Sequence, residues 1–174
     1  MNTRKWSVQL ADEAGIITLN KLAHIIWPIT FKDILKPAQI SYMLELMYSI
    51  DSLKQQQEQG CRLYILSADD EPIGYLSLEH ETGTSRLQKT DLTKVHKIYV
   101  LPAYHGTGAG RFLMDFALDE ARRYKSSGVF LNVNRYNKAT GFYEHYGFTI
   151  AYSEDINIGD GYLMEDYVMY HPFI

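Results

Sequence analysis

The chain has 174 residues, and we expect one domain over residues 1–174. Its 46% apolar residues suffice for a sizeable core, while the net charge of −4 argues against general nucleic-acid binding and is compatible with cationic substrates. The one cysteine, Cys61, excludes an internal disulfide and a cysteine-based metal site, and we expect it in the core. Because the sequence shows no signal core and no apolar stretch near about 18 residues, we expect a cytoplasmic protein with no membrane partner.

The first third of the sequence shows helical spacing of apolar residues interrupted by prolines. Pro28 is expected to break a helix, so Trp27–Phe31 is interpreted as an aromatic loop that either folds over a ligand or covers the core. The predicted elements here are a strand at 6–10, a helix over 13–26 with Asp12 as its N-cap, a helix that opens at Pro37, and a solvated helix end at 55–59 before Gly60.

The rest of the sequence alternates strands with two further helices, which predicts an α/β (α+β) domain with a mixed sheet. Gly128 and Gly147 are expected to follow helix ends. The predicted elements are strands at 61–67 and 73–79 around a turn at 69–72, a polar loop at 81–90, a strand at 95–101, a helix at 108–125, a strand at 129–133, a helix at 138–146, and strands at 148–152 and 162–170 around a turn at 157–161.

The stretch Val95–Arg111 combines a strand, a glycine-rich turn and the start of a helix. Gly106, Gly108 and Gly110 permit positive φ and close approach of a ligand. The first N–H groups of a helix lack intrahelical partners and lie at the positive end of its dipole, where a phosphate binds well. No Lys-Ser/Thr pair follows, and the spacing is not Gly-x-Gly-x-x-Gly, so neither common nucleotide motif fits. A flexible turn is the simpler alternative.

A second motif follows downstream in Leu131–Phe148, with Ala139, Phe142-Tyr143 and Gly147-Phe148 in order. Together with His105-x-x-Gly108-x-Gly110, it resembles the GNAT superfamily of acetyl-CoA-dependent N-acetyltransferases. The resemblance covers about residues 92–150. It implies a transferase (an acyltransferase) with a GNAT-like fold: a mixed, mostly antiparallel sheet of six to seven strands flanked by about four helices.

The resemblance implies acetyl-CoA as co-substrate and no metal. Ile98, Tyr99 and Val100 would pair with the pantetheine arm, and a histidine stands where the family has Arg or Gln at the start of its glycine motif. An asparagine of the second motif is assigned to the cofactor, either Asn134 or Asn137. The residues expected at the pyrophosphate are His105, Gly106, Thr107, Gly108, Ala109, Gly110 and Arg111.

The resemblance also assigns catalytic roles. Tyr143 matches the family's general acid, because its phenol can protonate the departing sulfur. His96 lies two residues before Ile98 and hence on the same strand face, which makes it a candidate base. Glu79 is the alternative base, and a water chain can also suffice. His80 and His145 are expected to be exposed.

The acceptor is expected to be a primary amine of a small molecule, with a polyamine or related cationic amine as one candidate. Protein or peptide N-acetylation and a non-catalytic acyl-CoA-binding module remain alternatives. The acceptor would be selected by loops at 27–36, 81–91 and 153–161, where Asp33, Glu79 and Asp160 could meet a cation. A homodimer through the C-terminal strands is one assembly that the family allows.

Overall fold

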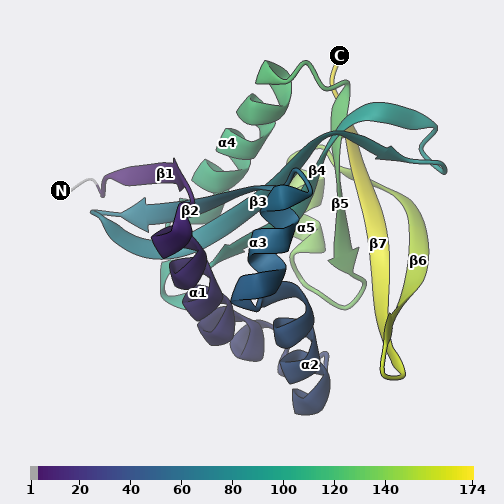
Figure 1. The fold of residues 1–174 in the computed structure, drawn as a ribbon. Coiled ribbons are helices and arrows are strands. Elements are labelled where there is room, and N and C mark those ends of the chain that lie inside the picture. Colours follow the sequence, from purple (N-terminus) through teal and green to yellow (C-terminus); the bar gives the residue numbers. More distant parts are fainter. Residues whose placement is uncertain (1–3) are drawn as a thin grey trace. The chain divides into compact units, whose positions relative to one another are not determined.

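The computed structural model describes residues 4–174, and within them the chain forms seven strands, five α-helices and one short 3₁₀ helix (Figure 1). The elements are β1 (Trp6–Leu10), α1 (Glu13–Phe31), α2 (Pro37–Tyr48), α3 (Ile50–Glu58), β2 (Arg62–Ala68), β3 (Glu71–Thr84), β4 (Lys89–Val100), η1 (Pro102–Tyr104), α4 (Ala109–Arg123), β5 (Gly128–Asn134), α5 (Thr140–His145), β6 (Thr149–Gly159) and β7 (Tyr162–Pro172).

The strands hydrogen-bond in the order β1-β2-β3-β4-β5-β7-β6. β1 with β2, β2 with β3, β5 with β7 and β6 with β7 pair antiparallel, whereas β4 and β5 pair parallel. This confirms the expected mixed, mostly antiparallel sheet, with one helix more than expected.

The described chain divides into two compact units. The first contains the residues up to Leu78 together with 97–119, and the second contains 79–96 and 120–174. β3 therefore begins in the first unit and ends in the second, and β4 begins in the second unit and ends in the first. The expectation of a single domain stays a prediction.

In the first unit, α1 begins where the sequence predicts, but it continues past Pro28. The Asp12 carboxylate caps it by accepting a hydrogen bond from Gly15 N at 2.8 Å. Pro28 offers no N–H to the carbonyl of His24, yet both residues are exposed, so water can satisfy that carbonyl. Trp27 and Phe31 lie in the last turns of α1, so the predicted loop is wrong. Both residues are buried, which confirms the alternative that they cover the core.

α1 also has the length and mean hydropathy, 1.2, of a membrane-spanning helix. Length and composition alone are weak evidence for a span, because the core helix of a folded domain passes the same test. Seven residues of α1 are buried here, among them Leu19 and Ile26, and the helix contacts α2, α3 and β2. These contacts fit a helix that packs in a protein core.

The predicted helix after Pro37 is two helices, because the chain breaks at Ser49. Ser49 adopts φ −57° and ψ 150°, and its hydroxyl accepts a hydrogen bond from Ser52 N at 3.3 Å to start α3. Cys61 is half-buried and precedes β2, so its expected place in a core strand is wrong.

The predicted polar loop at 81–90 is wrong as well. β3 runs to Thr84 and β4 begins at Lys89, so only four residues form the turn of a long hairpin. Threonines at 82, 84 and 90 suit a strand. Because both faces of these strand ends carry polar residues, the sequence lacks the alternation of apolar and polar residues that predicts a strand.

In the second unit, β5, β7 and β6 lie side by side (Figure 1). Gly147, at φ 92°, follows α5 as predicted. Gly128 does not follow α4 directly: Lys125 takes the positive φ of 56°, and Gly128 opens β5, where a Cβ would meet His171 O at 2.7 Å. β6 and β7 reach the turn at Asp160-Gly161, so most of the predicted loop at 153–161 is strand.

Candidate functional site

The predicted site residues fall into two groups, one in each unit, and each group has its own geometry. The first unit holds the glycine turn and the end of β4, and the second holds Glu79, His96, Tyr143 and the two asparagines.

The glycine turn adopts the conformation that its residues predict. Gly106 has φ 74° and Gly108 has φ 96°, which a side chain would strain. No described atom lies within 4 Å of a Cβ built at either glycine, so the backbone there is open to a ligand. Phe112 N donates to Gly108 O at 2.9 Å as α4 begins, and the first N–H groups of a helix generally lack intrahelical partners. This arrangement can hold an anion.

His105 has a structural role in this turn. Its Nε2–H donates to Val100 O at 3.1 Å, and its amide donates to Pro102 O at 3.1 Å. Thr107 closes the turn through its hydroxyl, which donates to Tyr104 O at 2.6 Å. The imidazole therefore ties the turn to the end of β4.

The segment Ile98–Val100 is the end of β4. β3 lies on one side of it: Leu101 N donates to Ile73 O at 2.7 Å, and a Cβ on Gly74 would stand 2.5 Å from Tyr99 O. The pairs of β4 with β5 run from Thr93↔Val129 to Val95↔Leu131, upstream of this segment.

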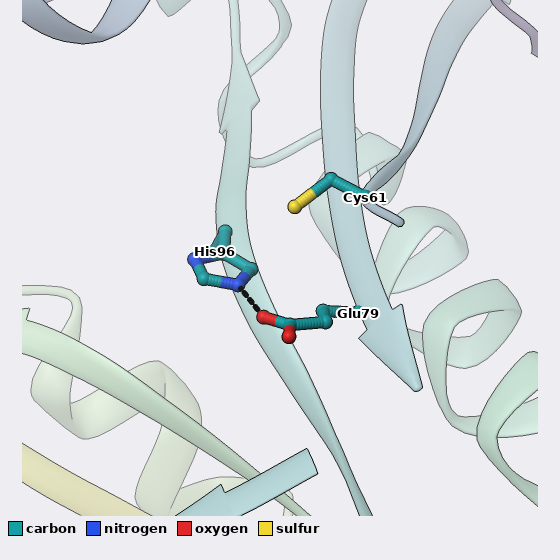
Figure 2. Close-up of side chains that lie close together, drawn as sticks. All are labelled: Cys61, Glu79 and His96. Carbon is teal, nitrogen blue, oxygen red and sulfur yellow. Dashed lines mark hydrogen bonds and ion pairs between the residues drawn. The ribbon is translucent and has the colours of Figure 1, made fainter. Parts of the chain in front are cut away.

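In the second unit, the two candidate bases are hydrogen-bonded to each other (Figure 2). His96 Nε2–H donates to Glu79 Oε2 at 2.6 Å, and the two side chains are 27% and 34% exposed. The carboxylate fixes one tautomer and stabilises an imidazolium, so Nδ1 of the ring is the atom that can accept a proton. The sequence offered the two residues as alternatives; the fold joins them into a dyad.

Tyr143 lies in α5 and is buried, 8% exposed, between Phe142 and Phe148. Burial raises the pKa of its phenol far above the ordinary value of 10.0. The hydroxyl thus stays protonated at neutral pH, as a proton donor must.

The two candidate asparagines both shape the loop after β5. Asn134 Oδ1 accepts from Tyr136 N at 2.9 Å, and Asn137 Oδ1 accepts from Ala139 N at 3.0 Å. Each oxygen thus accepts one backbone hydrogen bond, and each amide nitrogen can donate to a ligand. That contact stays a prediction.

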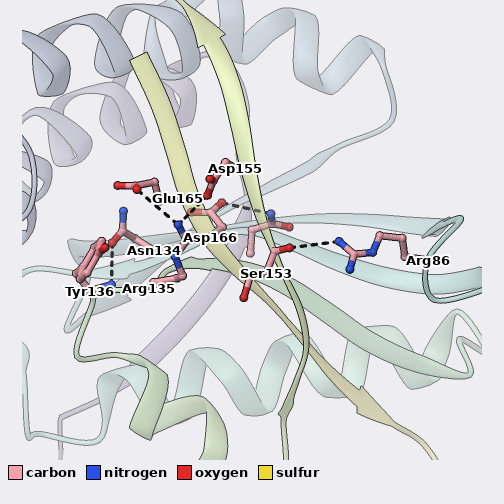
Figure 3. Close-up of polar contacts among 9 residues, drawn as sticks. Arg86, Asn134, Arg135, Tyr136, Ser153, Asp155, Glu165 and Asp166 are labelled. Atoms are coloured by element: carbon pink, nitrogen blue, oxygen red, sulfur yellow. Dashed lines mark hydrogen bonds and ion pairs between the residues drawn. The ribbon is translucent and has the colours of Figure 1, made fainter. Parts of the chain in front are cut away.

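A polar cluster that no sequence motif predicts lies between β5 and the β6–β7 hairpin (Figure 3). Arg135 pairs with Asp155 at 2.7 Å and Glu165 at 3.5 Å, which raises the pKa of the guanidinium. Asp166 is 3% exposed, and burial raises the pKa of its carboxyl; the Asn132 amide donates to it at 3.3 Å. These charges are satisfied within the unit, which indicates a structural role.

His80 does not lie in solvent as predicted, whereas His145 is exposed as predicted. The His80 ring stacks on Tyr124 with centroids 3.7 Å apart, and its Nδ1 shares a hydrogen bond of 2.7 Å with Thr93 Oγ1. Asp33 and Asp160, offered as contacts for a cationic amine, are exposed.

Residues 59–150 match the family model described as "Acetyltransferase (GNAT) domain". This match covers more than half of the chain, and the fold agrees with it. The protein belongs to the GNAT family of acetyltransferases, as the two sequence motifs predict.

Particular relatives bear similar names. An uncharacterised N-acetyltransferase of Mycobacterium bovis is 37% identical over 82 residues, which are 47% of this chain and 52% of that protein. The chain thus spans about half the length of the first curated relatives that it matches. An uncharacterised N-acetyltransferase of Escherichia coli is 28% identical over 102 residues, 58% of this chain and 59% of its own.

Two solved structures share the fold over nearly the whole chain. The PaiA N-acetyltransferase of Thermoplasma acidophilum, in complex with coenzyme A, superposes with a TM-score of 0.76 at 19% identity over 97% of this chain and 99% of its own. A GCN5-related N-acetyltransferase of Rhodopseudomonas palustris gives 0.81 at 13% identity over 99% of both chains.

Proposed function

We propose that this protein transfers the acetyl group of acetyl-CoA to a primary amine of a small molecule. The observation that carries the proposal is the open glycine turn at the start of α4 in a chain that belongs to the GNAT family. The coenzyme A bound to the Thermoplasma relative supports the choice of co-substrate. We propose a cytoplasmic location, and a homodimer stays a prediction.

The cofactor would be held by backbone groups. The pyrophosphate binds the amides of Gly106–Arg111 at the N-terminus of α4, and the pantetheine arm pairs with Ile98–Val100 as an added strand. Backbone amides near the thioester polarise its carbonyl. No side chain of the turn has to be charged for this, which is why His105 can replace the family's Arg or Gln.

The chemistry is one acyl transfer. The neutral amine attacks the thioester carbon, the new C–N bond forms, and the C–S bond breaks as the tetrahedral intermediate collapses. His96, oriented by Glu79, takes the proton of the amine through Nδ1, directly or through water. Tyr143 gives its proton to the departing sulfur. The products are the acetylated amine and coenzyme A, and no metal is required.

A thiol-release assay with acetyl-CoA tests the proposal against polyamines, other alkyl- and arylalkylamines, aminoglycosides, amino acids and short peptides. Release with small amines supports it. Release with peptides alone identifies a protein acetyltransferase. If acetyl-CoA raises the Tm but no acceptor is consumed, the chain is an acyl-CoA-binding module; an unchanged Tm at millimolar acetyl-CoA refutes cofactor binding altogether.

A further inference from the structure

Five aromatic rings form one layer in the first unit, which we call the aromatic layer: Trp27, Phe31, Tyr48, Tyr75 and Tyr99. The Tyr99 ring contacts three of them, with centroid distances of 5.9 Å to Trp27, 6.4 Å to Phe31 and 5.4 Å to Tyr75. The other four rings are at most 4% exposed, whereas Tyr99 is half-buried. Tyr99 is therefore the ring through which the layer reaches solvent.

The position of Tyr99 on β4 connects this layer to the reaction. Its backbone lies between Ile98 and Val100, in the segment proposed above to hold the pantetheine arm. Side chains alternate along a strand, so the Tyr99 ring points to the opposite face from its two neighbours, toward α1. An amine that attacks a thioester held here must come within contact distance of this segment.

Two buried hydroxyls lie on β3. Tyr75 and Ser77 lie two residues apart on β3, hence on one face, and both are 0% exposed. Among the described residues, Ser77 Oγ has no hydrogen-bond partner, whereas the Tyr75 hydroxyl lies within hydrogen-bonding reach of Tyr48 and Trp27. Buried polar atoms normally find a partner in protein, water or ligand. A ligand with an N–H group, or a water that it holds, would supply one.

The charge in this layer restricts the ligand. Lys97 stands two residues before Tyr99 on the same strand face, and its ammonium lies 5.0 Å from the Tyr48 ring centroid and donates to Gln56 Oε1 at 2.7 Å. A second ammonium in this layer would be repelled by the ammonium of Lys97. A flat apolar group instead packs edge or face against Tyr99 without that repulsion.

We propose that Tyr99 and the aromatic layer bind the acceptor, and that they select primary amines with an aromatic or flat apolar group over polyamines. This inference rests on the proposed acetyl transfer. It assigns to Tyr99 a side-chain role in acceptor selection beside the backbone role in holding the cofactor.

The kinetic experiment compares 2-phenylethylamine, hexylamine and spermidine as acceptors for the unmodified protein and for Tyr99→Leu and Tyr99→Phe. Tyr99→Leu should raise the KM for 2-phenylethylamine about three- to tenfold, the range of an aromatic pair, while Tyr99→Phe retains it and the KM for acetyl-CoA is unchanged. The control, Tyr124→Leu, removes a 42% exposed tyrosine of the other unit and should change neither KM. Equal changes for all three amines, or a preference for spermidine, would overturn the inference.

A second measurement does not depend on turnover. In a Trp6→Phe variant, Trp27 is the one remaining tryptophan. Its ring centroid lies 5.9 Å from that of Tyr99, so its fluorescence reports on a ligand bound beside Tyr99. With coenzyme A present, 2-phenylethylamine should change its emission saturably and spermidine should not. A saturable change without any thiol release supports acceptor binding and refutes the proposed function. Thiol release with no emission change, at unaltered Tyr99, refutes this inference and leaves acetyl transfer standing.

Discussion

Replacing Tyr143 by Phe removes one hydroxyl and keeps the ring. The ring packs edge-on to Phe142 and Phe148, at 5.5 and 6.0 Å, and these contacts survive the change. We therefore expect the free energy of unfolding to change by less than about 1 kcal/mol. The backbone bonds that end α5, from Tyr146 N and Phe148 N to Tyr143 O, are also independent of the hydroxyl.

The effect on catalysis should be far larger. Because burial raises the phenol pKa, essentially every molecule carries the proton at neutral pH, and the variant loses the donor entirely. A positioned general acid contributes about 10²- to 10⁴-fold. We expect kcat to fall at least about 100-fold, equivalent to about 2.7 kcal/mol of transition-state stabilisation.

Steady-state thiol release measures kcat, and the Tm with and without acetyl-CoA measures cofactor binding. The matched control is Tyr152→Phe, which removes a hydroxyl of the same unit that donates to Thr84 Oγ1 at 3.1 Å and lies outside the assigned machinery. Its kcat should be unchanged. If Tyr143→Phe keeps kcat within about twofold, Tyr143 is not the general acid and the sulfur is protonated from elsewhere.

Three further predictions follow from the geometry. Gly108→Ala should lower the free energy of unfolding by about 1 kcal/mol or more and weaken acetyl-CoA binding, because Gly108 has a φ of 96°. The control, Gly141→Ala in α5, has open space around its Cβ and should leave stability and binding intact. Equal effects of the two changes would argue against an anion-binding role of the glycine turn. Glu79→Gln should lower kcat/KM about tenfold and alter the pH-rate profile, since His96 loses the carboxylate that orients it, and an unaltered profile would separate His96 from proton transfer. The free energy of unfolding should fall as the pH rises above 10.0, by about 1.4 kcal/mol per pH unit for each buried tyrosine. The reason is that tyrosines ionise first in the unfolded state, whereas the raised pKa in the folded state keeps Tyr143 neutral. In urea titrations at alkaline pH, Tyr143→Phe should make this dependence on pH less steep.

The local features of the site could be predicted from the sequence because they depend on contacts between residues that are close in the chain. Positive φ at Gly106 and Gly108 follows from a turn between a strand and a helix, and Asp12 caps its helix through a contact three residues away. The failures came where tertiary packing overrode local signals. Pro28 does not end α1, since burial of Trp27 and Phe31 outweighs one missing hydrogen bond on an exposed face.

The family, the strand–turn–helix at Val95–Arg111 and the candidacy of Tyr143 can be predicted from the sequence, because glycine conformation and motif spacing are properties of neighbouring residues. Which distant residues meet follows from the fold. His96 and Glu79 are seventeen positions apart and became one hydrogen-bonded pair through the long hairpin of β3 and β4, whose middle the sequence reading took for a loop. The aromatic layer likewise brings α1, α2, β3 and β4 together. Such contacts depend on strand pairing and helix packing, which no local pattern in the chain specifies.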